Sequence, residues 1–411
     1  MNLTKSQTKP RLLYVENFLH SFQSSRLTVA QHAAAHGFDV HVALPLSGVD
    51  TASLDSTIEW HDLAIDRHLN PVGESRTLAG LMTLYRRLRP DLIHHIRPKA
   101  IVYGGLAARM LRIRAVVNTL TGMGHVFHTD SMKARLLRPA LGEGLRLACR
   151  HPNQRLVVQN SDDFEDCLRW RICPANRLVL IHGSGVDLDR YRPLPEPAGT
   201  PLVILPSRML WDKGVREFVA AAELLRERGV HARFALVGRV DPDSPAALTI
   251  ADLERWQRSG AVEWWGWQED MKQVLAQSHA VCLPSYGEGA PRALMEAAAC
   301  ARAIVTTHVA GCRDVVIDGR NGLVVPPRDV PSLTAALERL ITQPQLRARL
   351  AANGPHLMAE NFSLRAVIAR NLAIYREVLA VAPRRPGLHV VTPDAPRCQD
   401  EARTPVCARF A

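Results

Sequence analysis

The stretch Ser285-Tyr286-Gly287-Glu288-Gly289-Ala290-Pro291-Arg292-Ala293-Leu294-Met295-Glu296 decides the fold of this chain. An apolar run, Ala280–Pro284, comes before it and predicts a buried strand, and helix-forming residues at 292–301 follow it. Two glycines and a proline between them predict a tight turn. The helix after the turn starts with backbone N–H groups that lack an intrahelical acceptor, at the positive end of the helix dipole. This arrangement predicts a site for an anion with hydroxyl groups beside it, such as a sugar nucleotide.

The same alternation of apolar runs and helical stretches extends along almost the whole chain. In the first half we expect strands at Leu12–Val15, Val40–Leu44, Leu92–His94, Ala115–Asn118, Leu156–Gln159 and Leu178–Ile181. The helices expected there are Ser25–His36, Leu78–Leu88, Lys99–Met110, Lys133–Arg150 and Ser161–Trp170. In the second half we expect strands at Leu202–Leu205, Phe234–Val237, Val262–Trp264, Ala280–Leu283, Ile304–Thr306 and Leu323–Val325. The helices expected there are Gly214–Arg228, Pro245–Gln257, Met271–Gln277, Pro291–Ala301, Pro331–Thr342, Leu346–Glu360 and Ser363–Ala380.

Strands that are apolar throughout and alternate with helices predict parallel sheets covered on both faces. The proline-rich stretch at 193–201 divides the pattern into two halves. The expected fold is therefore α/β, with two doubly wound, Rossmann-like domains and an interdomain cleft. We expect an N-terminal domain at 1–192, a linker at 193–201, a C-terminal domain at 202–362, a further helix at 363–381 and a disordered tail at 382–411. Ligands of such sheets bind beyond the carboxyl ends of the strands, which places the site in the cleft.

Composition narrows the class of partner. The 411 residues carry a formal net charge of +11, which is compatible with an anionic partner such as a phosphate group or an acidic membrane face. Aromatic residues make up only 5%, which gives little support to a platform that stacks single-stranded nucleic acid. The polar start of the chain shows no signal peptide, and no apolar run has the length of a membrane span. A cytoplasmic location is expected.

Two cations and two carboxylates are the first candidates for chemistry. Arg208 and Lys213 bracket a loop directly after the strand at 202–205, where together they suit a diphosphate. Glu288 and Glu296 can accept hydrogen bonds from neighbouring sugar hydroxyls. The alternative is a surface loop with two solvated cations, and for Glu296 a plain ion pair with Arg292 at i,i+4 spacing.

Four segments in this order carry a family resemblance: Arg208 to Lys213, Val262–Met271, Glu288 to Glu296, and Asp318–Pro327. With them, residues 11–380 resemble the family-4 retaining glycosyltransferases of the GT-B fold. The resemblance implies that Arg208 and Lys213 contact the donor diphosphate, and that Glu288 contacts the hexose and Glu296 the ribose. It places Trp267 near the nucleotide base and adds backbone contacts from Gly289, Ala290 and Pro291. It also implies that the last helix crosses back to the first domain.

The first domain resembles a subgroup. Asp91–Gly104 and Asn118–Phe127 look like bacterial transferases that extend sugars linked to undecaprenyl diphosphate, with UDP-hexoses or UDP-N-acetylhexosamines as donors. These enzymes build O-antigen, capsule, exopolysaccharide or N-glycan precursors. Many family members carry His-x-His after a strand, whereas this chain has His94-His95-Ile96. His94 is assigned to catalysis together with Glu288, Arg208 and Lys213. The alternatives are that His95 or His125 replaces the missing second histidine, or that no histidine does.

A basic segment around 131–150 suggests a membrane contact. Basic side chains together with leucines at spacing four are typical of a helix on an anionic membrane surface. The alternative is a core-facing helix with a solvated basic face, and Pro139, Gly142 and Gly144 argue against one unbroken helix. The residues expected to contact the acceptor or the membrane are Lys99, His125, Lys133, Arg135 and Arg138.

The sequence thus predicts a retaining glycosyltransferase that moves a sugar from a UDP-sugar donor to an undecaprenyl-diphosphate-linked acceptor at the cytoplasmic face of the inner membrane. No Asp-x-Asp pair stands at a strand end, so neither a metal nor another cofactor is expected. The alternatives are a GT-B sugar-nucleotide epimerase or phosphorylase, and a non-catalytic basic protein that binds membrane or nucleic acid. Of these partners, nucleic acid is not expected.

Overall fold

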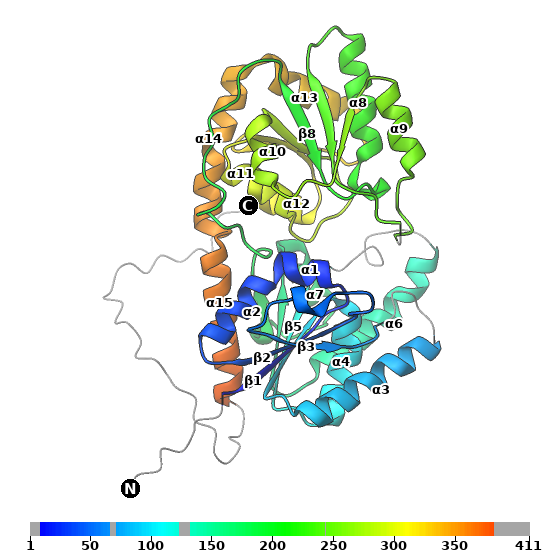
Figure 1. Cartoon of the computed structure of the whole chain (residues 1–411), viewed down its shortest axis with the longest axis vertical. Helices are drawn as coiled ribbons and strands as arrows, with labels where there is room; N and C mark the ends of the chain where they lie inside the picture. The colour runs from blue at the N-terminus through cyan, green and yellow to red at the C-terminus, as the bar shows by residue number, and fades with distance from the viewer. Residues whose placement is uncertain (1–8, 66–70, 123–131, 243, 382–411) are drawn as a thin grey trace, which may run out of the picture.

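Two parallel sheets organise the chain in the computed structural model, which describes residues 9–65, 71–122, 132–242 and 244–381. The first sheet has seven strands in the order β3-β2-β1-β4-β5-β6-β7, and the second has six in the order β10-β9-β8-β11-β12-β13. Both follow the strand order of doubly wound nucleotide-binding domains. Figure 1 shows the two domains one above the other. The predicted fold class is confirmed.

The first domain supplies seven strands and six helices in its described residues. The strands are β1 Arg11–Val15, β2 Asp39–Leu44, β3 Glu59–Asp62, β4 Leu92–Ile96, β5 Ala115–Leu120, β6 Gln154–Val158 and β7 Leu178–Leu180. The helices are α1 Leu19–Ser25, α2 Leu27–Ala35, α3 Pro71–Leu88, α4 Pro98–Met110, α6 Met132–Cys149 and α7 Ser161–Arg169. Apolar side chains of β1, β2 and β4 face both sides of the sheet and form two separate core clusters.

The second domain has the same architecture. Its strands are β8 Leu202–Pro206, β9 Arg233–Val237, β10 Glu263–Gly266, β11 Ala280–Leu283, β12 Ala303–Thr307 and β13 Gly322–Val325. Its helices are α8 Val215–Glu227, α9 Ile250–Arg258, α10 Met271–Gln277, α11 Arg292–Ala299, α12 Ala310–Val315, α13 Val330–Thr342 and α14 Pro344–Asn361. Short 3₁₀ turns at Thr51–Ser53, Ala175–Arg177 and Trp211–Lys213 complete the described elements.

The last helix, α15 Leu364–Val381, joins the core of the first domain. Figure 1 shows α14 beside the second domain and α15 continuing along the first. The hydroxyl of Tyr375 on α15 lies 3.0 Å from the hydroxyl of Tyr14 on β1. The linker, in contrast, is held to the second domain, because the buried guanidinium of Arg302 donates to the carbonyls of Leu194 and Pro195 at 3.0 and 2.8 Å.

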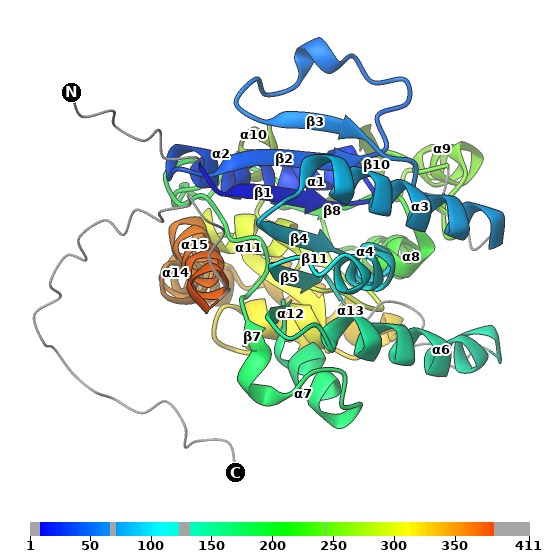
Figure 2. The same ribbon diagram turned by 90° about the horizontal axis from the view of Figure 1, so that it is seen from below.

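Three local expectations need correction. The polar edge strand β3 was not expected, because Glu59-Trp60-His61-Asp62 has no apolar run; Figure 2 shows it at the outer edge of the first sheet. The helix expected at 25–36 corresponds to α2, whereas α1 before it was not expected; the two helices are separated at Arg26, whose φ of −130° is not helical. Helix α9 starts at Ile250 and not at Pro245, because Thr249 and Asp252 form a capping box there.

Helix α6 is also continuous, although Pro139 and two glycines argued against one unbroken helix. One of these glycines, Gly144, allows close packing between helices, whereas a Cβ on Gly142 would meet nothing within 4 Å. A Cβ on Gly144 would lie 3.1 Å from the Val102 side chain of α4, and a Cβ on Gly105 of α4 would lie 2.6 Å from Ala148 of α6. Over the described part of the chain, no helix combines the length and apolar character that a membrane crossing requires.

Candidate functional site

The centre of the candidate site is an ion pair between two loops. Lys213 follows β8 and Glu288 follows β11, and Lys213 Nζ donates to Glu288 Oε1 at 2.6 Å. The next residue after the lysine, Gly214, has a φ of +71°, and a Cβ there would lie 2.0 Å from the carbonyl oxygen of Pro284. Only glycine allows this approach of the two loops. The two side chains are each about 15% exposed, so the pair is largely shielded from water.

A cavity of about 180 Å³ opens at the carboxyl ends of the second sheet's strands, and neither Lys213 nor Glu288 is among its lining residues. Its walls include Arg208, Trp267 and Glu296, which the sequence assigned to the diphosphate, the base and the ribose. Arg239 and Gln268 also line it. Trp267 is 52% exposed, which is unusual for a tryptophan and leaves its ring open to a ligand. The tertiary structure thus gathers three separately predicted donor residues around one cavity.

Glu296 combines the two interpretations that the sequence left open. Its carboxylate is buried and pairs with Arg292 at 2.7 Å, one helical turn back on α11. The same carboxylate accepts a hydrogen bond from the hydroxyl of Tyr191. Burial raises the pKa of Glu296, and the Arg292 guanidinium opposes that shift. The predicted i,i+4 ion pair is therefore present, and the residue also faces the cavity.

The first domain reaches over the cavity through α1. The imidazole of His20 meets the Trp267 ring edge-on with 5.5 Å between the centroids, and the Arg239 guanidinium lies 5.1 Å from the centroid of the same ring. Burial lowers the pKa of His20, and the charges of Arg239, Arg292 and Arg208 lower it further. The positive field that this shift reports is suited to a diphosphate.

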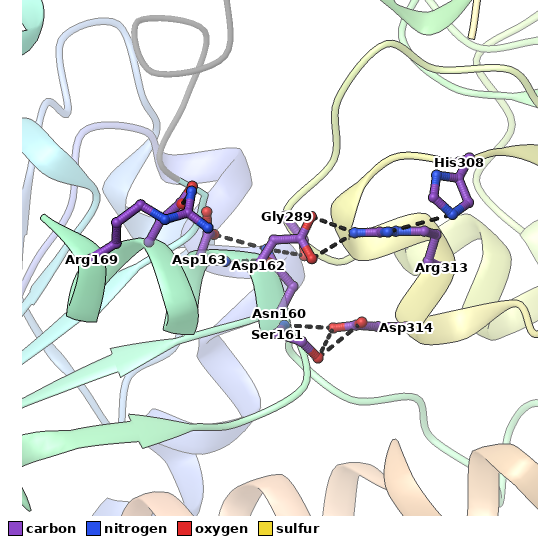
Figure 3. A network of polar contacts seen from close by, with 10 residues as sticks. Asn160, Ser161, Asp162, Asp163, Arg169, Gly289, His308, Arg313 and Asp314 are labelled. Carbon is purple, nitrogen blue, oxygen red and sulfur yellow. Dashed lines mark hydrogen bonds and ion pairs between the residues drawn. The ribbon is translucent and has the colours of Figure 1, made fainter. Parts of the chain in front are cut away.

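A polar network connects the two domains next to the glutamate loop, as Figure 3 shows. The side-chain amide of Asn160, the N-cap of α7, donates to the carbonyl of Gly289 at 2.9 Å. Two further contacts run from α7 to α12: Arg313 donates to Asp162 at 2.5 and 2.6 Å, and the backbone N–H of Ser161 donates to Asp314 at 2.8 Å. These contacts fix Gly289, and hence the neighbouring Glu288, relative to the first domain.

Gly289 also marks a close approach between the domains. A Cβ at this position would lie 2.3 Å from the backbone carbonyl oxygen of Thr121, at the end of β5. Such a distance is well inside van der Waals contact. Helix α11, which begins three residues later, after Pro291, has no side-chain cap hydrogen bond at its N-terminus. Gly289, Ala290 and Pro291 thus lie where the domains meet, next to the start of this helix.

The histidines of β4 occupy the core and not the cleft. His94 is fully buried, with its ring nitrogens 2.7 Å from the hydroxyls of Tyr375 and Thr119. Burial lowers the pKa of His94 well below its usual value. His95 is bonded to Tyr85 and Asn118, and Ile96 belongs to the hydrophobic core. A side chain so enclosed cannot reach a substrate, so the catalytic role expected for His94 needs correction to a structural one.

The residues expected at the acceptor or the membrane are only partly described. Lys99 at the start of α4 pairs with Glu74 of α3 at 2.7 Å, and both side chains are about 14% exposed, which indicates a helix-to-helix contact. Arg138 is half-buried on α6. The side chains of Lys133 and Arg135, and the whole of His125, lie outside the described residues.

Sequence reasoning missed several cleft residues. Arg97, which follows β4, has a φ of +79°, uncommon outside glycine, and its guanidinium donates to the buried carboxylate of Glu16 at 2.6 Å. Glu16 directly follows β1, and Arg239 lies two residues after β9. The signal that could have found them is a charged residue just beyond the carboxyl end of a parallel strand. No sequence signal marks His20 or Asn160, which reach the site through the packing of the domains.

Comparison with known proteins agrees with this geometry. Residues 200–343 match the family described as glycosyl transferases group 1, and residues 11–158 match the family described as glycosyl transferase 4-like. The chain is 26% identical over 324 residues to the Campylobacter jejuni N,N'-diacetylbacillosaminyl-diphospho-undecaprenol alpha-1,3-N-acetylgalactosaminyltransferase, covering 76% of this chain and 83% of that protein. It is 22% identical to the Escherichia coli UDP-Gal:alpha-D-GlcNAc-diphosphoundecaprenol alpha-1,3-galactosyltransferase, covering 83% of this chain and 89% of that one.

Among solved structures, the sucrose-phosphate synthase of Thermosynechococcus elongatus superposes with a TM-score of 0.76 at 18% identity, covering 91% of this chain and 100% of the other. At that identity the likeness concerns the fold. The two matched family models, supported by this likeness in fold and by the cavity at the carboxyl ends of the second sheet, identify the protein family. The chain belongs to the glycosyltransferases of the GT-B fold, with a 4-like first domain and a group 1 second domain.

Proposed function

We propose that this glycosyltransferase moves a hexose or N-acetylhexosamine from a UDP-sugar to a lipid-diphosphate-linked glycan in the synthesis of O-antigen, capsule or exopolysaccharide. The observation that carries the proposal is the cavity that Trp267, Arg208 and Glu296 line together, in the domain whose loops also hold the Lys213–Glu288 pair. The names of the two relatives support the acceptor, since both contain an undecaprenol-linked diphosphate, and one names UDP-Gal as its donor.

In this proposal the base, the ribose and the diphosphate of the donor are each bound by different residues. The base lies on the exposed ring of Trp267, and the ribose hydroxyls donate to the Glu296 carboxylate. Arg208 donates to Asp241 at 2.8 Å, and Lys213 donates to Glu288. The bound diphosphate replaces these two carboxylates as the partner of the two cations. A diphosphate that binds Lys213 releases Glu288 to accept hydrogen bonds from the sugar hydroxyls.

The reaction breaks the bond between the anomeric carbon and the diphosphate oxygen. The electron pair of that bond stays with UDP, and the added negative charge falls near Arg208, Lys213 and the N-terminus of α11, which act in place of a metal. The acceptor hydroxyl adds to the anomeric carbon from the leaving-group face and passes its proton to the departing phosphate oxygen. The new glycosidic bond then has the same anomeric configuration as the bond in the donor, so the reaction proceeds with retention.

We further propose that the first domain contacts the anionic cytoplasmic face of the inner membrane. The basic residues of α6 support this, since each basic group near such a surface contributes about 1 kcal/mol. Co-sedimentation with vesicles should then require anionic lipid. Equal binding to neutral vesicles, or none at all, would contradict a charge-driven contact.

The donor is tested by thermal unfolding with UDP, GDP and ADP at equal concentration. We expect UDP to raise the unfolding temperature most, and Trp267→Ala to abolish the shift. Trp170→Ala is the matched control, because Trp170 is 41% exposed in the first domain and does not line the cavity. No protection by any nucleotide would contradict the proposal and favour a non-catalytic protein.

The reaction is tested with a radiolabelled UDP-sugar and a synthetic undecaprenyl-diphosphate sugar, after chelation of metal ions. Transfer of label to the lipid with the donor's anomeric configuration is the expected result. Conversion of the donor in the absence of acceptor would indicate an epimerase, and phosphate-dependent release of sugar 1-phosphate a phosphorylase. An inverted product would contradict retention.

A further inference from the structure

Four ionisable residues form a row on one face of the first sheet, at the edge formed by β2 and β3. In the parallel register of these strands, His41 is opposite Glu59 and Ala43 is opposite His61. Side chains alternate between the two faces of a strand, so Asp39, His41, Glu59 and His61 all lie on the same face. His41 is buried, His61 is half-buried and Glu59 is exposed. None of them lines the cavity at Trp267.

Three of these side chains converge on one point. His41 Nδ1 lies 3.1 Å from His61 Nε2 and 3.3 Å from a carboxylate oxygen of Glu59, and the other oxygen lies 3.8 Å from His61 Nε2. Zinc binds nitrogen and oxygen ligands at about 2.0–2.1 Å, which in a tetrahedral site separates neighbouring ligand atoms by about 3.3 Å. In the described part of the chain, this is the group of His, Cys, Asp and Glu whose ligand atoms approach closely enough for a metal ion.

A proton count argues against a plain hydrogen-bonded cluster. His41 Nε2 is buried and lies 3.3 Å from the Asp39 carboxylate without a hydrogen bond among the described residues. If that nitrogen carries the proton, a lone pair is left on Nδ1. The only hydrogen that can then serve the group is the one on His61 Nε2. It faces His41 Nδ1 and the Glu59 carboxylate at once and can satisfy one of them fully. A divalent cation in its place would satisfy all three.

The surroundings also resemble those of a metal ligand. Histidine ligands usually donate their second ring N–H to a carboxylate, which fixes the ring and its tautomer. For His41 the acceptor would be the Asp39 carboxylate, 3.3 Å from Nε2, and Arg11 lies 3.4 Å from Asp39 on the other side.

We propose that His41 Nδ1, His61 Nε2 and the Glu59 carboxylate bind one divalent transition-metal ion, of the zinc class that imidazole and carboxylate ligands favour. A water molecule would complete the tetrahedron. The ion would hold the polar edge strand β3 to β2. Of the residues of β3, Trp60 is the one that packs against a hydrophobic cluster. The site is structural, and the transfer reaction proposed above does not use it.

The test titrates the full chain, without an affinity tag and after dialysis against a chelator, with Co²⁺ and then Zn²⁺. We expect one equivalent of Co²⁺ to give the intense visible absorption of a tetrahedral site, and Zn²⁺ to displace it. Glu59→Gln and His61→Gln should each weaken binding by about 10-fold or more. Glu59 is exposed, so its variant tests the site even where His61→Gln unfolds, which far-UV circular dichroism would reveal.

The matched control is the double variant His32→Gln, His36→Gln on α2. These histidines also form a pair, at i,i+4 spacing, but each Nδ1 contacts a backbone carbonyl of its own helix. The double variant should bind metal as the unmodified protein does. The proposal is overturned if binding persists in Glu59→Gln at full affinity, if the control loses it, or if the unmodified protein binds no metal at micromolar concentration.

Discussion

Lys213 Nζ lies 2.6 Å from Glu288 Oε1, and the two residues are 75 positions apart in the chain. The pair joins the loop after β8 to the loop after β11, two neighbouring strands of the second sheet. Beside it, Arg208 pairs with Asp241 and Arg292 with Glu296. Each of these three cations therefore has a carboxylate partner, which a bound diphosphate or sugar hydroxyl would replace under the function proposed above.

Lys213→Ala should lower kcat by about 100-fold or more, because the ammonium would stabilise charge that develops as the sugar leaves the diphosphate. The fold should persist, since Glu288 is near enough to the cleft to be hydrated. Steady-state kinetics and thermal unfolding check both statements. Lys272→Ala, which changes a lysine of α10, is the control and should leave kcat unchanged. Full activity in Lys213→Ala would refute the mechanism.

Glu296→Gln should raise the KM for the donor by about 10- to 100-fold and change kcat less, because hydrogen bonds to a charged group are worth about 1.5–3 kcal/mol. The substitution keeps the shape of the side chain. Glu338→Gln serves as control, since it breaks a surface pair with Arg228 at 2.8 Å and is remote from the cavity. An unchanged KM in Glu296→Gln would show that the carboxylate serves only its ion pair with Arg292.

Gly289→Ala should reduce kcat by about 10-fold or more, because the new Cβ would meet the Thr121 carbonyl at 2.3 Å and force the domains apart. Small-angle scattering should show a more open molecule. Gly287→Ala is a close control in the same loop, where a Cβ meets nothing within 4 Å. Similar activities for the two variants would mean that the approach of Gly289 to Thr121 is not required for turnover.

Acid should destabilise the protein through its buried histidines. Burial lowers the pKa of His95 to about 4, whereas an unfolded histidine titrates near about 6.5. The unfolded state therefore takes up the proton first, so the stability is fully present above pH 6.5 or so and is lost as the pH falls toward 4. The slope should approach about 1.4 kcal/mol per pH unit for this residue.

Urea unfolding at several pH values between these limits measures that slope. His95→Gln should flatten it, whereas His356→Gln should not, because His356 is 73% exposed. A slope that His95→Gln leaves unchanged would assign the acid sensitivity to other groups, of which His94 is the first to examine.

Strand periodicity was a reliable guide to the fold. Every strand of the second sheet and six of the first were predicted from apolar runs, because a strand buried on both faces needs apolar side chains throughout. The polar strand β3 at the sheet edge was not predicted, because its residues carry no apolar pattern and its pairing with β2 holds it in place. The short helix α1 was also missed, since Phe22 is the buried residue among its seven and no apolar period marks it in the sequence.

Some residues of the candidate site could likewise be predicted from the sequence, and others could not. Arg208, Lys213, Glu288 and Glu296 could be found from the sequence, because parallel strands bring their carboxyl ends to one edge wherever the domain folds. His94 was misplaced, because a histidine in a strand looks the same in sequence whether it faces the cleft or, as here, the hydroxyls of Tyr375 and Thr119.

The sequence by itself determined the two doubly wound domains and the strand ends that carry the donor residues, because these depend on local apolar patterns and on turn residues. Only the tertiary structure decided which groups meet: His20 on Trp267 and Asn160 on the Gly289 carbonyl across the domains, and Lys213 on Glu288 within the second domain. Such contacts join residues far apart in the chain, and their geometry depends on how whole helices and loops pack, which no local pattern encodes.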